Sequence, residues 1–266
     1  MQPIIKWTGS KRSQAKEIVS YFPKDINTYY EPFLGSASVL YYVNANRYIG
    51  NDICMPLMKL WRMIRDNHQE LLDSYSLHWN QLQKYGKDYY YEVRKQFNQY
   101  QLPEDLFFLS RTCTNGLIRF NKKGEFNSSF HLTRFGIHPT RLSPILCDWS
   151  SKVSKVCFTI GDYAIPTLWA EKGDFIYFDP PYFHSHTVYM GSFDYEKFYR
   201  VLTILKEKKV NYAISLDGIR NTTDKTIQIP KKLYKRHILL YSGTSSYDRI
   251  MYKKQTKVYE SLYLNY

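Results

Sequence analysis

The sequence predicts an α/β fold in which a doubly wound, mostly parallel sheet is interrupted by a helical insertion. Strand and helix patterns alternate over residues 1–55 and again over residues 151–266. Between them, residues 56–150 show helical periodicity without strands. At 266 residues and 44% hydrophobic composition, the chain can form one large domain that carries a smaller one. We therefore expect a sheet domain of residues 1–55 and 151–266 and an inserted domain of residues 56–150.

The first segment alternates helix and strand signals. Residues 11–22 have a helical apolar spacing, and Pro23 ends that helix. Residues 28–33 are predicted to form a strand, followed by a turn and a helix over residues 34–43. A second strand is expected over residues 47–52. This order is typical of the opening of a doubly wound parallel sheet.

The insertion begins with amphipathic helices, predicted over residues 58–83 and 87–100. A polar, basic stretch over residues 115–142 then indicates a long loop or hairpin. After it the alternation of strands and helices resumes. The predicted segments are 155–162, 174–179, 194–209, 211–218 and 258–266, of which 194–209 is a helix.

The chain is basic, with 37 Lys and Arg against 24 Asp and Glu, a formal charge of +13 and a pI of about 9.4. A polyanionic partner explains this charge best, and nucleic acid is the usual one; a merely soluble basic protein is the alternative. Its 26 Tyr, 15 Phe and 5 Trp, interleaved with Lys and Arg, suit base stacking together with phosphate contact.

Cysteine usage and hydropathy indicate the compartment. The four cysteines form no CxxC pair and have no histidines at ligand spacing, so we expect reduced thiols and no metal site. No apolar run approaches the roughly 20 residues that span a bilayer. The first residues, MQPIIKWTGSKR, lack the apolar segment of a signal peptide. We expect a cytoplasmic protein without a membrane partner.

The most specific motif is GDFIYFDPPYF, residues 173–183. Asp179 ends a strand and is expected in the crevice where α/β sheets bind ligands. Pro180 and Pro181 lack N–H groups and restrict φ, which presets the direction of the Pro180 carbonyl. The carboxylate and this carbonyl are two acceptors for one NH₂ group, and Tyr182 offers a face to a planar ring. We interpret the motif as a pocket for an exocyclic amine; a polar turn is the alternative.

Two further segments suggest a cofactor site. In EPFLGSAS, residues 31–38, small residues let a ligand approach the backbone, and Asp52 at the next strand end can accept hydrogen bonds from ribose hydroxyls. An ordinary tight turn explains the same residues. In KWTGSKR, residues 6–12, an aromatic ring and cations surround Gly9 and could stack on a heterocycle and hold an anion. A solvated basic loop is the alternative there.

The segment NGLIRFNKKGEFN, residues 115–127, is a candidate for DNA contact. Arginine reads guanine edges, asparagine reads adenine, and lysine neutralises phosphates. Arg119, Lys122 and Lys123 lie beside turn-forming Asn-Gly and Lys-Gly pairs. A solvated charged loop is the alternative interpretation.

The chain resembles the Dam-type (D12 class) family of DNA adenine-N6 methyltransferases in five segments, which follow that family's order: KWTGSKR, YEPFLGSASV, the acidic strand end IGND, NGLIRFNKKGEFN and FDPPYF. The resemblance covers nearly the whole length and implies a Rossmann-like, S-adenosylmethionine-dependent sheet with an inserted target-recognition domain. It implies site-specific transfer of a methyl group to N6 of a flipped-out adenine in double-stranded DNA, by direct displacement. "GSAS" replaces a more glycine-rich turn, and "SSFHLTRFGIHPTRL" replaces the usual segment after "GEFN". The family's GATC specificity is therefore not carried over.

The resemblance also implies roles for the matched residues and their neighbours. The expected catalytic residues are Asp179, Pro180, Pro181 and Tyr182. The expected cofactor-binding residues are Trp7, Lys11, Glu31, Pro32, Phe33, Gly35, Ser36, Asp52 and Asp179. The expected DNA-binding residues are Lys6, Asn115, Leu117, Arg119, Asn121, Lys122, Lys123 and Arg134.

Two alternative functions stay open at this point. One is an amino-methyltransferase acting on cytosine N4, RNA or a protein amide, although Asp rather than Ser or Asn before Pro-Pro-Tyr favours adenine. The other is a catalytically inactive DNA-binding relative. A cytosine-C5 enzyme is excluded because none of the cysteines follows a proline. We expect a monomer from a prokaryote or phage, with a cognate restriction endonuclease as a candidate partner.

Overall fold

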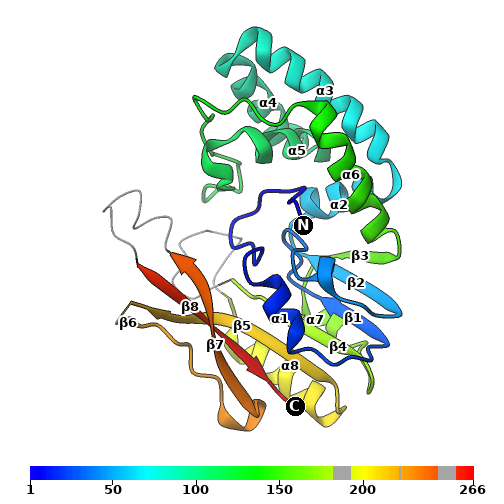
Figure 1. Cartoon of the computed structure of the whole chain (residues 1–266), viewed down its shortest axis with the longest axis vertical. Coiled ribbons are helices and arrows are strands. Elements are labelled where there is room, and N and C mark those ends of the chain that lie inside the picture. Colours follow the sequence, from blue (N-terminus) through cyan, green and yellow to red (C-terminus); the bar gives the residue numbers. More distant parts are fainter. Residues whose placement is uncertain (182–192, 222, 245–255) are drawn as a thin grey trace.

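The computed structural model describes residues 1–181, 193–221, 223–244 and 256–266 (Figure 1). It contains one sheet with the strand order β3-β2-β1-β4-β5-β8-β7, in which β6 pairs with β5. The strands are β1 (Thr28–Glu31), β2 (Arg47–Asp52), β3 (Val156–Ile160), β4 (Phe175–Phe178), β5 (Asn211–Arg220), β6 (Thr223–Asp224), β7 (Arg236–Thr244) and β8 (Lys257–Leu264).

The first five strands of this order are parallel, and β8 and β7 complete the sheet in antiparallel pairing. The chain moves outward from β1 to β2 and β3, then returns to β4 beside β1 and moves outward to β5. This reversal between β1 and β4 is the topological switch point at which α/β sheets bind ligands. The predicted doubly wound sheet is therefore confirmed.

The central strands β1 and β4 are buried on both faces, and their side chains alternate between the two faces. Tyr29, Phe175 and Tyr177 belong to one core cluster, whereas Ile176 and Phe178 belong to the other. The second cluster lies under the helix α8 (Tyr195–Glu207) and near α7 (Ala164–Thr167). The first continues from α1 (Ala15–Ser20) into the inserted helices, so the insertion shares its core with the sheet.

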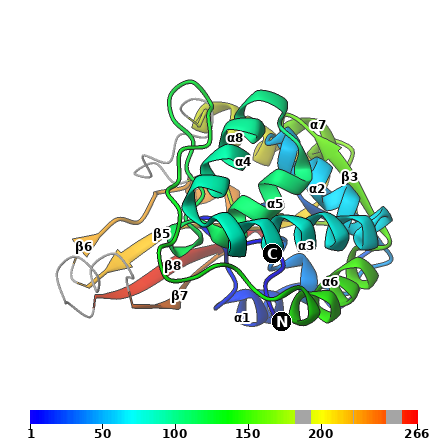
Figure 2. The ribbon, with the colours of Figure 1, turned by 90° about the horizontal axis from the view of Figure 1, so that it is seen from above.

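The inserted helices are α2 (Met55–Asp66), α3 (His68–Tyr85), α4 (Lys87–Tyr100), α5 (Pro103–Thr112) and α6 (Pro139–Val153). They gather at one end of the molecule, as Figures 1 and 2 show from two directions. α2 packs against β2 and β3 as well as against α5 and α6. It therefore joins the sheet to the rest of the insertion.

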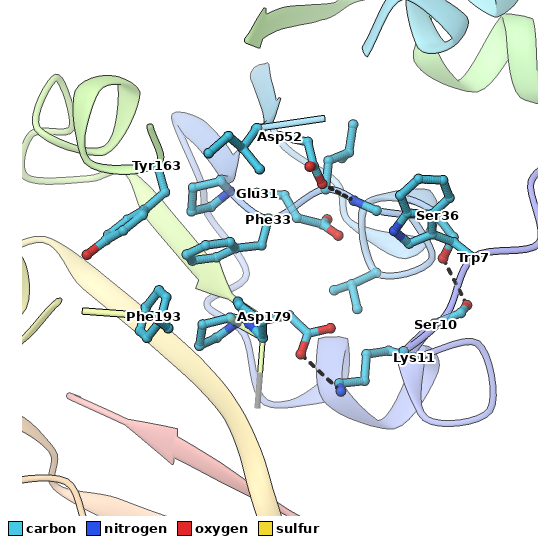
Figure 3. A pocket seen from close by; sticks show the side chains of 18 of the residues that line it. Trp7, Ser10, Lys11, Glu31, Phe33, Ser36, Asp52, Tyr163, Asp179 and Phe193 are labelled. Carbon is cyan, nitrogen blue, oxygen red and sulfur yellow. Dashed lines mark hydrogen bonds and ion pairs between the residues drawn. The ribbon is translucent and has the colours of Figure 1, made fainter. Parts of the chain in front are cut away.

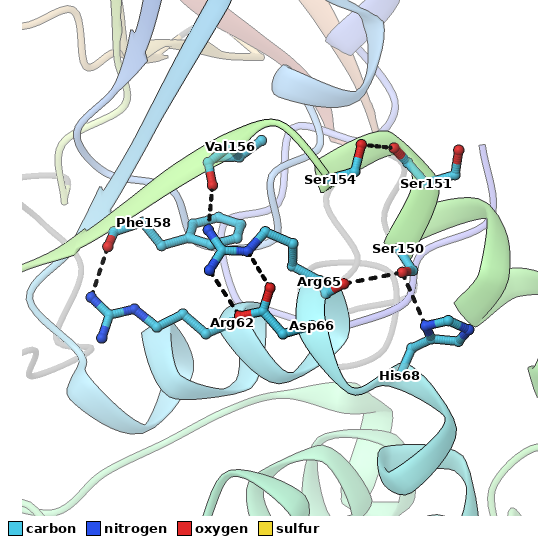
Figure 4. A network of polar contacts seen from close by, with 9 residues as sticks. All are labelled: Arg62, Arg65, Asp66, His68, Ser150, Ser151, Ser154, Val156 and Phe158. Atoms are coloured by element: carbon cyan, nitrogen blue, oxygen red, sulfur yellow. Dashed lines mark hydrogen bonds and ion pairs between the residues drawn. The ribbon is translucent and has the colours of Figure 1, made fainter.

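α2 also lies against β3, the strand at one edge of the sheet (Figure 4). β3 is the terminal strand, and Arg62 donates to the carbonyl of Phe158 at 2.7 Å. Arg65 donates to the carbonyl of Val156 at 2.7 Å and forms an ion pair with Asp66. Unpaired carbonyl groups on an edge strand can bond to a strand of another chain. The two arginines occupy these carbonyls and also hold α2 against β3.

Several elements differ from the sequence prediction. α6 begins at Pro139, inside the stretch expected to be a loop or hairpin, and β7 is not predicted from the sequence. Residues 34–43 form the expected turn, but the helix that follows it is the short 3₁₀ helix η1 (Leu40–Tyr42) and not an α-helix. Gly35 and Ala37 have φ values of +48° and +51°, which an α-helix cannot contain. α5 is not predicted from the sequence, because its residues are buried on every side and show no amphipathic period.

The pairing of β5 with β8 predicts a position that accepts only glycine. A Cβ added to Gly218 would lie 2.5 Å from the Tyr259 carbonyl oxygen and 3.1 Å from the Ser261 nitrogen. Both atoms are backbone, so Gly218→Ala must displace β8. We expect a loss of about 3 kcal/mol in the free energy of unfolding, measured by urea denaturation.

Gly124→Ala is the control, because nothing lies within 4 Å of the added Cβ. Its φ of +77° leaves only the left-handed strain, about 1 kcal/mol. Equal losses in the two variants would contradict the steric explanation.

Candidate active site

A pocket of about 550 Å³ lies at the switch point, where the carboxyl ends of the parallel strands meet (Figure 3). Each of four neighbouring strands contributes a carboxyl group to its lining: Glu31 ends β1, Asp52 ends β2, Asp162 follows β3 and Asp179 follows β4.

Among the described residues, no group of three or more His, Cys, Asp or Glu could hold a metal ion. None of their helices has the length and apolar character to cross a membrane.

Asp179 lies in the pocket directly after the buried strand β4. The Lys11 ammonium approaches its Oδ1 at 3.0 Å, and the Lys11 side chain is almost fully buried. Burial raises the pKa of Asp179 to about 6, although Lys11 opposes this shift and Glu260 adds to it. At neutral pH the carboxyl group is therefore ionised and can accept hydrogen bonds. Pro180 and Pro181 also line the pocket, whereas Tyr182 lies outside the described residues.

Glu31 faces the same pocket, but its carboxyl group is neutral where that of Asp179 is ionised. Its Oε2 accepts a hydrogen bond from the Tyr29 hydroxyl at 2.8 Å, and the residue is 3% exposed. Burial raises the pKa of Glu31 to about 8, and the nearby Asp179 charge adds to the shift. Glu31 is therefore protonated at neutral pH. Two neighbouring carboxyl groups thus divide their roles, with one able to donate and the other to accept.

Asp52 fixes the turn that follows β1. Its Oδ2 accepts from the Gly35 N–H at 3.0 Å, and its Oδ1 accepts from the Cys54 N–H at 3.0 Å. Burial raises the pKa of Asp52 even though these backbone N–H groups lower it. A Cβ on Gly35 would lie 3.1 Å from the Trp7 ring, so glycine lets Trp7 pack against the turn. The Trp61 indole also donates to the Gly35 carbonyl at 2.9 Å.

Three serine hydroxyls join the two segments expected to bind a cofactor. Ser36 donates to Ser10 at 2.8 Å, and Ser38 lies 2.9 Å from both. Residues 6–12 and 31–38 therefore form one wall of the pocket. Trp7, Lys11, Glu31, Pro32, Phe33, Gly35, Ser36, Asp52 and Asp179 all line the pocket.

Two aromatic residues beside the expected Phe33 are not predicted from the sequence, namely Tyr163 and Phe193. The rings of Phe33, Tyr163 and Phe193 lie 4.9–5.8 Å apart and form an aromatic surface. Lys197 forms an ion pair with Asp162 and lies over the Tyr163 ring. The sequence contains a signal for this part of the pocket: Asp162 follows the third strand in "IGD", just as Asp52 ends the second strand in "IGND".

The basic segment after α5 forms a hairpin with bridges at Cys113–Phe130 and Phe120–Phe126. Leu117 and Arg119 are exposed, whereas the intervening Ile118 is buried, so these two side chains share the open face. The expected DNA-binding residues Asn115, Lys122, Lys123 and Arg134 are also exposed.

Asn121 has a structural contact within this hairpin. Its Oδ1 accepts from the N–H groups of Lys123 and Glu125 at 2.9 and 3.0 Å. Its Nδ2 donates to the Glu125 carboxylate at 2.7 Å. The side chain therefore closes the turn that presents Lys122 and Lys123.

The hairpin is bonded directly to the pocket wall. The Thr8 hydroxyl donates to the Ile118 carbonyl and accepts from the Ile118 N–H, each at 3.1 Å. The half-buried Lys6 packs on Gly116, where an added Cβ would lie 2.6 Å from the lysine Cδ. The segment that carries Trp7 and Lys11 therefore also supports the exposed face of the hairpin.

Comparison with known proteins gives consistent matches. The family model of the D12 class N6 adenine-specific DNA methyltransferases matches residues 7–256. The Type II methyltransferase M.MjaIII of Methanocaldococcus jannaschii is 30% identical over 76% of this chain and 80% of its own. The DNA adenine methylase of Haemophilus influenzae is 32% identical over 68% and 64%. The Type II methyltransferase M.CviBI of Paramecium bursaria Chlorella virus NC1A is 30% identical over 79% and 80%.

The pKa of Glu31 predicts a pH-dependent cost in stability. The folded protein keeps this proton up to about pH 8, whereas the unfolded chain loses it near its ordinary value of 4.5. Between these values the folded state binds more protons, so the free energy of unfolding falls as pH rises. Glu31→Gln should remove a penalty of up to about 4 kcal/mol at alkaline pH.

Denaturant unfolding of both proteins across about pH 5–9 measures this effect. The stability difference in favour of the variant should grow with pH. Glu17→Gln, an exposed change on α1, is the control and should give a constant difference. A constant difference for Glu31→Gln as well would show that Glu31 is already ionised in the folded state.

Proposed function

The chain belongs to the D12 class N6 adenine-specific DNA methyltransferase family and methylates adenine in DNA site-specifically, and we propose that S-adenosylmethionine is its methyl donor, bound in the pocket at the switch point. The convergence of Asp179, Lys11 and the strand-end carboxyl groups in one pocket carries this proposal. The family's adenine specificity favours this function over cytosine-N4 methylation.

The pocket residues fit this cofactor. A volume of about 550 Å³ lies within the range of small-molecule sites. Asp52 offers acceptors for ribose hydroxyls, and the rings of Phe33, Tyr163 and Phe193 offer a surface to a planar base. Lys11 and Gly35 both line the pocket beside Trp7 and would lie next to the methionine part. When bound, S-adenosylmethionine supplies an electrophilic methyl group on a sulfonium.

Asp179 and the Pro180 carbonyl prepare the acceptor amine. The N6 lone pair of adenine is delocalised into the ring, which makes the amine a poor nucleophile. Hydrogen bonds from its N–H groups to these two acceptors localise the lone pair on nitrogen. As the new N–C bond forms, the bond between the methyl carbon and the sulfonium sulfur would break and leave a neutral thioether. The Asp179 carboxylate would stabilise the positive charge that develops on N6 until one N6 proton passes to water. Alignment of the reacting atoms supplies the rest, and no covalent enzyme intermediate is needed.

We propose that residues 56–150 form the target-recognition domain, which contacts double-stranded DNA. The exposed face of the hairpin, with Leu117 and Arg119, would read bases, and Lys122 and Lys123 would contact phosphates. The target adenine must leave the duplex, at a cost of a few kcal/mol, to reach Asp179. The net charge of +13 suits such a partner.

Asp179→Ala tests the catalytic role. The variant should lose at least about 10³-fold in methyl transfer, because the amine loses its charged acceptor. DNA affinity should change by less than about threefold, since binding energy comes mainly from phosphate contacts. The measurement is transfer of a labelled methyl group from S-adenosylmethionine to unmethylated DNA, with mass spectrometry of the modified base.

Asp25→Ala, an exposed acid removed from the surface, is the matched control and should keep wild-type activity. Persistent methylation by Asp179→Ala would reject the mechanism. If calorimetry detects no binding of S-adenosylmethionine to the wild-type protein, the cofactor assignment is wrong.

The hairpin makes a separate prediction about specificity. Arg119→Ala should cost about 1–3 kcal/mol at the cognate site and relax sequence preference at one position. Lys122→Ala should weaken binding to all sequences equally and reduce the salt dependence by about one ion. Binding titrations at several salt concentrations, with cognate and mutated sites, distinguish the two. The same response from both variants would contradict the division into base and phosphate contacts.

A further inference from the structure

Glu260 lies beside the proposed catalytic group although it comes from the far end of the chain. It belongs to β8, where it pairs with Asp217 of β5 and Leu240 of β7. Its Oε2 lies 3.1 Å from the Lys11 ammonium, which also lies 3.0 Å from Asp179 Oδ1. Glu260 falls outside the residues that match the family model, and no sequence motif singles it out.

We propose that Glu260 is a positioning residue for methyl transfer: it shares the Lys11 ammonium with Asp179 and so keeps Asp179 available to the amine of the target base. This inference rests on the proposed role of Asp179.

The geometry explains why the sharing matters. Charge-assisted hydrogen bonds are about twice as strong as neutral ones. A lysine held by Asp179 alone would therefore compete with the neutral amine for the same carboxylate. Glu260 gives Lys11 a second anionic partner in a site where all three side chains are largely buried. The ammonium can then stay in place when Asp179 turns to the amine.

The Glu260 carboxylate is itself held in place. The Ser242 hydroxyl of β7 donates to its Oε1 at 3.2 Å, which leaves Oε2 toward Lys11. This contact depends on β8 lying between β5 and β7, so the antiparallel end of the sheet reaches the catalytic group.

Other ionisable groups on the strands beside Asp179 are either neutral or paired with another charge. On β1, burial raises the pKa of Glu31 to about 8 and also raises the pKa of the Tyr29 hydroxyl. Both groups are therefore neutral at pH 7. On β5, Asp217 lies 3.4 Å from Arg220. Within the described part of the chain, the charged groups that shift the pKa of Asp179 are Lys11 and Glu260, and the negative charge of Glu260 makes Asp179 a stronger acceptor.

Glu260→Gln tests the proposal, because it removes the charge but keeps the size and the acceptor for Ser242. We expect the single-turnover rate of a preformed enzyme, DNA and S-adenosylmethionine complex to fall roughly tenfold at neutral pH. The acid limb of its pH profile should move to lower pH. Asp179 would lose a neighbouring negative charge and gain the undivided ammonium, both of which lower its pKa. DNA affinity should stay unchanged.

Controls separate this role from a structural one. Glu207→Gln, an exposed change on α8, should reproduce the wild-type profile. If Glu260→Gln does not fold, Glu260→Asp keeps the charge but shortens its reach, and should move the acid limb in the same direction by less. A Glu260 variant that loses thermal stability while its rate and acid limb match the wild type would overturn the proposal.

The proposed function fails separately. A wild-type profile for the Glu260 variants together with an inactive Asp179→Ala would reject the role of Glu260 and leave that of Asp179 intact. An active Asp179→Ala would reject both.

Discussion

The site depends on the burial of one ammonium group. Lys11 is 5% exposed, and a buried cation is tolerated only where anions and hydrogen bonds replace its water. Its partners, Asp179 and Glu260, come from β4 and β8, and Lys11 itself precedes α1. Three distant parts of the chain must therefore fold correctly before this charge is compensated. The mixed sheet makes this possible, because Asp179 follows the parallel strand β4 and Glu260 lies in the antiparallel strand β8, and the N-terminal segment brings Lys11 to both.

Environment, more than residue type, distinguishes the carboxyl groups along that edge. Glu31 is buried against a tyrosine hydroxyl and stays protonated, whereas Asp179 is held by an ammonium and is ionised at neutral pH. Asp52 is held by backbone N–H groups, which hold its turn in place. Carboxyl groups at neighbouring strand ends thus yield one donor, one acceptor and one structural anchor.

Much of this could be predicted from the sequence because the signals are local. The buried strands before Asp52 and Asp179 and their acidic ends appear as short runs of residues, and the sheet topology follows from their order. What could not be predicted depends on tertiary contact. α5 is buried on all sides, and Glu260 meets Lys11 only because β8 inserts between β5 and β7.

The reciprocal bonds between Thr8 and Ile118 bear on how such proteins diversify and can be redesigned. On the hairpin side, both bonds use main-chain atoms, so they place no demand on the identity of the residue at position 118 beyond its fit in the core. Neighbouring exposed positions can therefore be exchanged without altering the joint. An insertion or deletion between Gly116 and Ile118 would instead shift the register against Thr8. Grafting a hairpin from a relative should accordingly preserve its length at this point and leave its outward-facing side chains free to vary.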